Sequence, residues 1–345
     1  MKKTKAQSVK AQEANSLVES LQQYFVSQLN ETASSKQIQS FKKVEWFRDE
    51  GRHGGGVRYE ANNKEVFNRG SVNVSQIHYD DDSSSRSLAS ATAISTIIHP
   101  ESPYIPSIHM HISWTEMKNG QGYWRMMADL NPAIENEVDK VLFDKNMKSV
   151  TSEVYDIATE QGERYFFIPA LNRHRGVSHF YLEEYNSGDS QGDFKLAEIL
   201  GKTAIDSYIQ IFDQAIKKND KAIDDDYKKQ LAYHTLYLFQ VLTLDRGTTS
   251  GLLVHNQNDV GIMGSLPAQI DKTLLSSWKN KVLTPQDQLV QGILDVLPND
   301  NPCVVNEEVK RALAEVVRKH YKSNPQALGM QAQGNVVPET VGNHQ

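Results

Sequence analysis

The chain has 345 residues, of which 39% are hydrophobic and 23% are charged, and its formal net charge is −6. This composition is typical of a folded protein with a sizeable core, and the negative charge argues against a general nucleic-acid binder. The single cysteine, Cys303, excludes an internal disulfide framework and a cysteine-based zinc or iron–sulfur site. No apolar run reaches membrane-spanning length and the N-terminus lacks the apolar core of a signal peptide, so we expect a cytoplasmic protein without a membrane span.

The first part of the chain predicts one helix followed by antiparallel strands. Apolar residues recur at helical spacing over residues 8–29, which predicts an amphipathic opening helix. Alternating and β-branched stretches then predict strands at residues 41–48, 57–61, 65–67 and 71–79, with a hairpin turned at Asn62 and Asn63. The polar residues 80–87, DDDSSSRS, predict a mobile loop, after which the sheet resumes at Ile94.

Residues 93–114, AISTIIHPESPYIPSIHMHISW, predict two strands joined by a proline-containing turn. On the second strand His109, His111 and Ser113 alternate with apolar residues, and the period of two along a strand places them on one polar face. The turn brings His99 of the first strand toward His109. This polar face is the first candidate for a reactive surface.

The rest of the chain mixes short strands with longer helices. We expect strands at residues 122–130, 165–168, 176–182 and 260–263, and helices at residues 134–158, 194–216, 227–239, 269–296 and 304–321. Residues 324–345 are rich in Gln, Gly and Asn, which predicts a disordered tail. The order of elements predicts an α+β fold, a large antiparallel sheet flanked by helices, with residues 1–300 as one domain and residues 301–345 as a C-terminal helix and tail.

The histidine face suggests two kinds of chemistry. His99, His109 and His111 could offer imidazole ligands to a divalent metal, with Asp129 as a carboxylate ligand. Alternatively, His109 transfers protons without a metal, because imidazole titrates near neutral pH. An ordinary polar face of a sheet is a third interpretation, and the residues by themselves leave all three open.

A second candidate is the tripeptide Asp245-Arg246-Gly247, which we expect at a strand end or tight turn. A buried Asp–Arg pair is more often structural than catalytic. An aspartate that accepts a proton beside an arginine that binds an anion is also the arrangement needed to act on an acidic substrate. Ser95 shares the face of His99 and could bind the same ligand.

Several motifs follow one another in a specific order: WFRDEGRHGGGVRYE, EVFNRGSVNVSQIH, SxxIHPESPYIPSIHMH, ADLNP, LDRGTTSGL and SLP. This combination resembles the oxygen-dependent coproporphyrinogen III oxidases over residues 41–285. The resemblance implies an antiparallel sheet sandwiched by helices on both faces, a homodimer and a cleft for a flexible tetrapyrrole. It also implies that two propionates of coproporphyrinogen III are oxidatively decarboxylated to vinyls, with molecular oxygen as co-substrate and without an organic cofactor.

Six residues match site residues of that family: Ser95, His99, His109, Asp129, Asp245 and Arg246. The resemblance implies that Ser95 contacts substrate and that His109 donates a proton. Asp129 matches a motif aspartate, and we expect it to be catalytic together with His109 and Asp245. Asp245 matches a carboxylate that holds or deprotonates a pyrrole nitrogen, and Arg246 binds a propionate or supports its neighbour.

The chain also departs from the family pattern. Where the family has Asn-x-Arg after the second histidine, this chain has His111-Ile112-Ser113, so a propionate-binding arginine is missing. We expect Arg125, on a neighbouring strand, to supply that charge and His111 to contact the ligand. Two other functions stay open: a divergent homologue that binds a tetrapyrrole or another ligand without this activity, and a metal-dependent oxygenase with histidine ligands.

Overall fold

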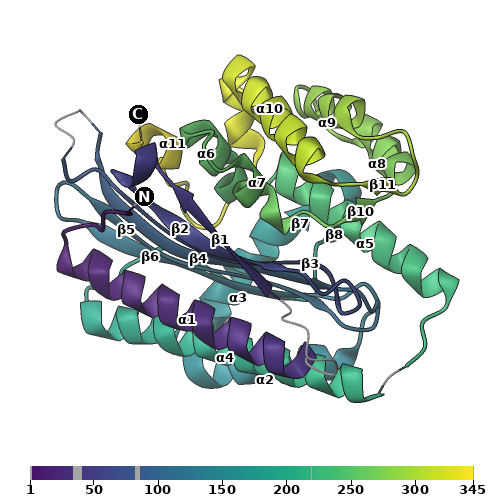
Figure 1. Ribbon diagram of the computed structural model, residues 1–345, viewed down its shortest axis with the longest axis horizontal. Coiled ribbons are helices and arrows are strands. Elements are labelled where there is room, and N and C mark those ends of the chain that lie inside the picture. Colours follow the sequence, from purple (N-terminus) through teal and green to yellow (C-terminus); the bar gives the residue numbers. More distant parts are fainter. Residues whose placement is uncertain (1, 34–40, 82–85, 219, 345) are drawn as a thin grey trace.

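The computed structural model describes residues 2–33, 41–81, 86–218 and 220–344. Its centre is one antiparallel sheet of seven strands in the order β1-β2-β3-β4-β5-β6-β9 (Figure 1). Strands adjacent in the chain pair with each other up to β6, and β9 then pairs with β6. The bounds are β1 Phe41–Phe47, β2 Gly54–Ala61, β3 Phe67–His78, β4 Leu88–Pro100, β5 Ser107–Met117, β6 Gly122–Asn131 and β9 Ser178–Tyr185.

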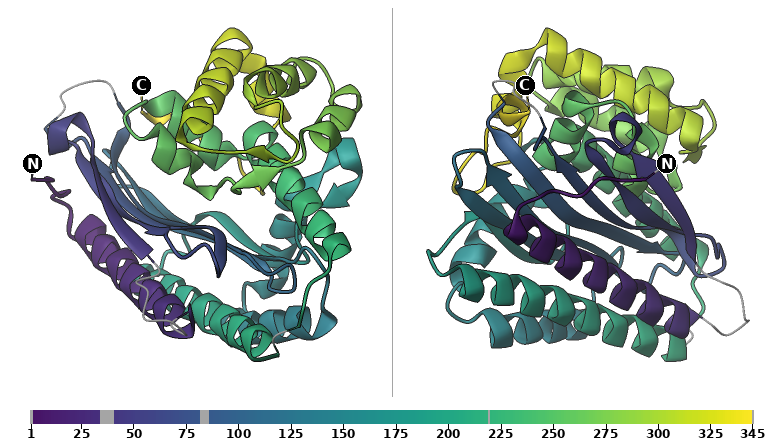
Figure 2. Two further views of the ribbon diagram at one scale, coloured as in Figure 1. Left: turned by 45° about the vertical axis from the view of Figure 1, so that its right-hand side comes forward. Right: turned by 60° about the vertical axis from the view of Figure 1, so that its left-hand side comes forward.

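Three helices cover one face of the sheet, as Figure 2 shows from two sides. They are α1 (Val9–Ala33), α2 (Glu137–Thr151) and α4 (Ser190–Lys218). Helices α1 and α4 pack against the central strands and against each other, and α2 packs on α4. Helix α3 (Tyr155–Phe166) lies next to β9. The apolar side chains between these helices and the sheet form the larger hydrophobic core.

The second face is covered by helices from the last third of the chain, beginning at Asp224. Its helices are α5 Asp224–Thr243, α6 Arg246–Val254, α7 Asp259–Ile262, α8 Lys272–Trp278, α9 Gln286–Val296, α10 Glu307–Ser323 and α11 Thr340–Asn343. The described residues also form two short strand pairs: β7 (Phe167–Ile168) with β8 (Arg173–His174), which lie between α3 and β9 in the chain, and β10 (Gln269–Ile270) with β11 (Cys303–Val304), which precede α8 and α10. The described helices include none that is long and apolar enough to cross a bilayer.

Strand β5 shows why the two faces of the sheet differ. Ile108, Met110 and Ile112 are fully buried in the core beneath α1 and α4. The side chains between them, His109 and His111, point to the opposite face because successive residues of a strand alternate sides. The expected α+β fold, with helices on both faces of an antiparallel sheet, is thereby confirmed.

Some element predictions were wrong, chiefly where apolar runs were short. Residues 260–263 belong to helix α7 and a following 3-10 turn, not to a strand. Tyr165 and Phe166 end helix α3, and the helix expected at residues 134–158 is two helices, α2 and α3. Short apolar runs do not distinguish strand from helix. Strand β4 already begins at Leu88, where small residues hide the alternation, and residues 82–85 of the predicted loop lie outside the described residues.

The prediction of a disordered tail was also wrong. Helix α10 buries Val309, Leu313 and Val317 in the same core as α5 and α9. After it, Gln331 is buried and donates to Thr249 Oγ1 and Tyr321 Oη. Polar groups of the tail thus make hydrogen bonds to other elements of the protein.

Replacing Leu200 by alanine tests the α4 contribution to the core. Leu200 is 0% exposed, so Leu200→Ala should lower the free energy of unfolding by about 2–5 kcal/mol through lost burial and the cavity left behind. Leu283 is 75% exposed, so the control Leu283→Ala should change the free energy of unfolding by less than about 0.5 kcal/mol. Urea unfolding followed by circular dichroism measures both; equal effects would contradict the packing of α4.

Candidate active site

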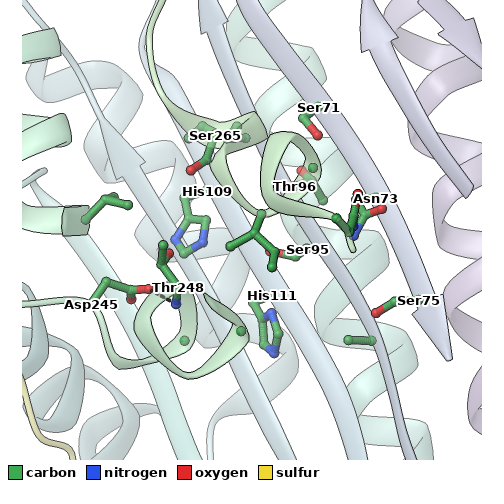
Figure 3. A pocket seen from close by; sticks show the side chains of 18 of the residues that line it. Ser71, Asn73, Ser75, Ser95, Thr96, His109, His111, Asp245, Thr248 and Ser265 are labelled. Carbon is green, nitrogen blue, oxygen red and sulfur yellow. Dashed lines mark hydrogen bonds between the residues drawn. The ribbon is translucent and has the colours of Figure 1, made fainter. Parts of the chain in front are cut away.

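A cavity of about 260 Å³ lies between the polar face of the sheet and helices α5, α6 and α7. Figure 3 shows its sheet side, where His109 and His111 face the start of α6 at Asp245 and Thr248. Ser95 lies between the histidines and β3. Five of the predicted site residues therefore line one cavity: Ser95, His109, His111, Arg125 and Asp245.

The strand register arranges the polar face in rows that cross the sheet. One row runs Ser71, Ile97, His109 and Asp129. The next runs Asn73, Ser95, His111 and Met127. The third runs Ser75, Ala93, Ser113 and Arg125. Residues distant in sequence thus become lateral neighbours, which is why a motif on β4 shares a site with motifs on β5 and β6.

His109 is held by a buried carboxylate. Its Nδ1 lies 2.9 Å from Asp129 Oδ1, and Arg175 Nη2 donates to Asp129 Oδ2 at 2.6 Å. Asp129 is 0% exposed and Arg175 is 1% exposed. Burial by itself would raise the pKa of Asp129, but the charge of Arg175 and the contact with His109 lower it to about 2. With Nδ1 donating to an ionised aspartate, Nε2 is the ring nitrogen left for a ligand.

Asp129 lies behind His109, outside the lining of the cavity. It does not line the cavity, because Arg175, Asn131 and His109 enclose its carboxylate. A carboxylate that fixes the tautomer and orientation of an imidazole makes that imidazole a better-placed proton carrier. The structure supports Asp129 as a positioning residue, and direct contact with a ligand would require His109 or Arg175 to move.

His99 has a structural position. Its Nδ1 lies 2.8 Å from Ser107 Oγ and its Nε2 lies 3.1 Å from the Ser265 carbonyl oxygen. Both ring nitrogens thus have protein partners, and burial lowers the pKa of His99 well below its usual value. The expected metal-ligand pair of His99 and His109 is not formed, because neither His99 nitrogen is available. Within the described ranges, no group of three His, Cys, Asp or Glu side chains is placed to hold a metal.

Asp245 begins helix α6. Its Oδ2 accepts from the Thr248 backbone N–H at 2.7 Å and its Oδ1 accepts from Tyr165 Oη at 2.8 Å. The expected strand end is thus a helix N-cap, which an aspartate stabilises. Burial disfavours the charge, yet Arg125 and the Thr248 N–H lower the pKa of Asp245 below its usual value. An ionised carboxylate facing the cavity can accept a hydrogen bond from a ligand N–H.

Arg125 lies across from Ser113 in the paired strands β5 and β6. Its Nε donates to Tyr181 Oη at 3.0 Å and its Nη2 donates to Tyr165 Oη at 3.1 Å. The guanidinium is thus held by two hydroxyl groups rather than by a carboxylate of the described residues. A cation in this environment can bind an anionic ligand without first leaving a salt bridge.

His111 lies on the polar face of β5, and Arg246 is the first residue of helix α6. Burial and the nearby Arg125 lower the pKa of His111 to about 3, so it is a neutral hydrogen-bonding group. Its Nε2 lies 3.0 Å from Ser113 Oγ. Arg246 is buried and its Nη1 lies 3.5 Å from Glu183 Oε1. Both line a second cavity that adjoins the first.

Sequence reasoning missed several site residues. Arg175 is separated from Asp129 in the chain and has no periodic pattern of its own, so no local signal reveals the pair. Tyr165 was assigned to a strand. The β3 residues Ser71, Asn73 and Ser75 also line the cavity, and the alternation in SVNVS was the signal that could have identified them.

Comparison with known proteins gives a consistent result. The family described as "Coproporphyrinogen III oxidase" matches residues 13–295. The mitochondrial oxygen-dependent coproporphyrinogen-III oxidase of Rattus norvegicus is 26% identical over 286 residues, which cover 75% of this chain and 62% of the rat protein. The protein of that name from Prochlorococcus marinus is 26% identical and covers 82% of this chain and 89% of the relative. The protein of that name from Rickettsia akari is 28% identical, and the match covers 67% of this chain and 84% of the relative. The chain thus spans less than two thirds of the rat protein.

The buried pair of Arg175 and Asp129 can be tested by a double-mutant cycle. Arg175→Met should lower the free energy of unfolding by about 3–5 kcal/mol, because it leaves the Asp129 carboxylate buried without its cation. Adding Asp129→Asn should cost less than the sum of the two single changes. Lys202→Met removes an exposed ion pair with Glu198 and should cost less than about 1 kcal/mol. Strict additivity in urea unfolding would contradict the pair.

Proposed function

Because the chain belongs to the coproporphyrinogen III oxidase family, we propose that it catalyses the oxygen-dependent oxidative decarboxylation of coproporphyrinogen III to protoporphyrinogen IX in haem biosynthesis. The observation that carries the proposal is one cavity lined by a positioned imidazole, an ionised carboxylate and a guanidinium: His109, Asp245 and Arg125. These are the groups that a substrate with pyrrole N–H donors and carboxylate side chains would require.

Each group has a distinct role in this proposal. Arg125 binds a propionate through charge-assisted hydrogen bonds. Asp245 accepts a hydrogen bond from a pyrrole N–H and stabilises positive charge on the ring as electrons leave it. Its depressed pKa favours this role over that of a general base.

His109 exchanges the proton through Nε2 while Asp129 holds Nδ1. Each propionate carboxylate loses carbon dioxide, one proton and a pair of electrons to become a vinyl group, and molecular oxygen takes up two electrons and two protons to give hydrogen peroxide. No organic cofactor is needed in this scheme, because the electron-rich tetrapyrrole is itself the reductant.

The second candidate is a homologue that binds a tetrapyrrole or a related carboxylate without converting it. The observation that favours it is the change at Ser113, where the family pattern has an arginine. Arg125 lies on the adjacent strand and offers the same charge from a different position. A single activity measurement separates the two functions. A homodimer and a cytoplasmic location are further parts of our proposal, based on the resemblance and on the sequence.

Asp245→Asn tests the proposed reaction. Coproporphyrinogen III incubated with the protein in air should give protoporphyrinogen IX, measured as protoporphyrin fluorescence after oxidation. Asparagine keeps the cap of α6 but removes the charge that stabilises the oxidised ring, so kcat should fall by about 10²–10³. Asp271→Asn is the matched control, because Asp271 caps helix α8 in the same way. If the unaltered protein gives no product, the oxidase function is excluded and the binding function is favoured. If kcat is unchanged in Asp245→Asn, the role proposed for the Asp245 carboxylate is wrong.

Arg125→Gln tests the anchoring of a propionate. The change removes one charge-assisted interaction worth about 1.5–3 kcal/mol, so the Kd for coproporphyrin III should rise at least tenfold. Binding is followed by the shift in porphyrin absorption, which works whether or not the protein turns the substrate over. Arg311→Gln changes an exposed arginine of α10 and should leave the Kd unaltered. An unaltered Kd in Arg125→Gln as well would show that the carboxylate binds elsewhere.

A further inference from the structure

The second cavity continues the first along the sheet. It has a volume of about 210 Å³ and shares His111, Arg125, Gly247 and His255 with the first cavity. Each cavity by itself is smaller than the usual ligand site of about 300–1,000 Å³. A large ligand would therefore extend from one cavity into the other.

The second cavity is rich in positive charge. Three arginines line it, namely Arg48, Arg125 and Arg246, and Glu183 is the one carboxylate among the described lining residues. Arg48 is 7% exposed, and its Nη1 has no hydrogen-bond partner in the described part of the chain. A buried guanidinium with an unpaired N–H donor is unfavourable unless an anion or a water molecule accepts its hydrogen bond. This excess of cations indicates a carboxylate-binding subsite.

The C-terminal segment of the chain lies over this subsite. Pro338, Thr340, Asn343 and His344 line the second cavity opposite the sheet. We name residues 338–344 the strap. The strap lies beyond residues 13–295, the part of the chain that matches the family. Figures 1 and 2 show this end of the chain, in yellow, beside α6 and above the sheet.

Two carbonyl oxygens of the strap contact arginines. Arg246 Nη2 donates to the Pro338 carbonyl at 3.0 Å, and Arg86 Nε donates to the His344 carbonyl at 2.9 Å. Two side-chain contacts also fasten its end, Ser87 Oγ with Asn343 Oδ1 at 2.8 Å and Tyr79 Oη with His344 Nδ1 at 3.3 Å. Backbone carbonyls occupy guanidinium donors that a ligand carboxylate would bind more strongly.

The strap is less buried than the segment before it, since none of residues 338–344 is buried. Gln331 is buried, the Ala332 N–H donates to the Leu244 carbonyl, and the Gly334 and Asn335 N–H groups donate to Glu183 and Gln161. Helix α11, within the strap, buries none of its described residues. Val336 and Val337 between the two parts are 38% and 55% exposed. The strap can therefore lift at residues 336–337 while the preceding segment stays in place.

We propose that the strap covers a carboxylate-binding subsite at Arg246 and Arg48, and that it must lift before the carboxylate end of a ligand can enter. The identity of the ligand as a tetrapyrrole rests on the proposed function. The proposal that the strap covers the subsite is based on the contacts of the strap alone. The Pro338 carbonyl oxygen occupies Arg246 Nη2 until a ligand carboxylate displaces it, so that ligand entry and strap release are linked.

A reversible cross-link tests the proposal in the full chain. In Ser87→Cys/Asn343→Cys the two thiols replace side chains already in contact, and the native Cys303 is 0% exposed and should not compete. The oxidised form, with the strap held down, should bind coproporphyrin III at least tenfold more weakly than the reduced form. Reductant should restore the Kd of the unaltered protein. Ser87→Cys by itself cannot form the cross-link and should not respond to reductant.

Labelling with phenylglyoxal gives a readout that needs no tetrapyrrole. Arg246 and Arg48 should be modified more slowly in the oxidised than in the reduced protein, as mapped by mass spectrometry. Should the cross-link fail to form, Asn343→Ala/His344→Ala removes side-chain contacts of the strap and should speed the same labelling. Equal labelling in closed and open forms, or equal affinity for coproporphyrin III, would overturn the proposal. If labelling differs between the oxidised and reduced forms but the protein does not bind porphyrin, the strap covers the subsite and the ligand is not a tetrapyrrole.

Discussion

The two faces of the central sheet have opposite chemistry, and this constraint underlies every other feature of the molecule. Alternation along β5 sends Ile108, Met110 and Ile112 into the core under α1 and α4 and sends His109 and His111 to the other side. A shift of one residue in register would exchange the two sets and place imidazoles in the core. The burial of the apolar face therefore fixes the position of the polar groups in the cavity. Stability and site geometry depend on the same pairing.

The polar face works as a site because its charges are set by burial and by one another. Asp129 stays ionised although fully buried, since Arg175 and His109 offset the cost of removing it from water. Asp245 is kept ionised in part by Arg125, which is itself held by tyrosine hydroxyl groups. The result is a cavity lined by an ionised carboxylate at Asp245 and a neutral imidazole at His111, into which His109 presents Nε2.

The sequence predicted the sheet and its helices well, because long alternating strands and long amphipathic helices carry strong periodic signals. It also placed Ser95, His109, His111, Arg125 and Asp245 on what proved to be one cavity. It could not place groups whose role depends on distant partners. Arg175 and Tyr165 contact the site through tertiary packing alone. The tail was mistaken for disorder because its partners are backbone groups and side chains of other elements, which composition does not reveal.

The position of Arg125 has a consequence for comparing relatives of this protein. Adjacent strands lie about 4.8 Å apart, a displacement that a long arginine side chain can span. Because Ser113 and Arg125 are paired in register, a guanidinium lost from one strand can be regained on the next without moving the anion it binds. A sequence alignment would show a missing arginine at a position where the neighbouring strand still supplies the charge. Functional competence in such divergent chains is therefore better judged by the two-dimensional lattice of side chains on the sheet than by motifs along a single strand.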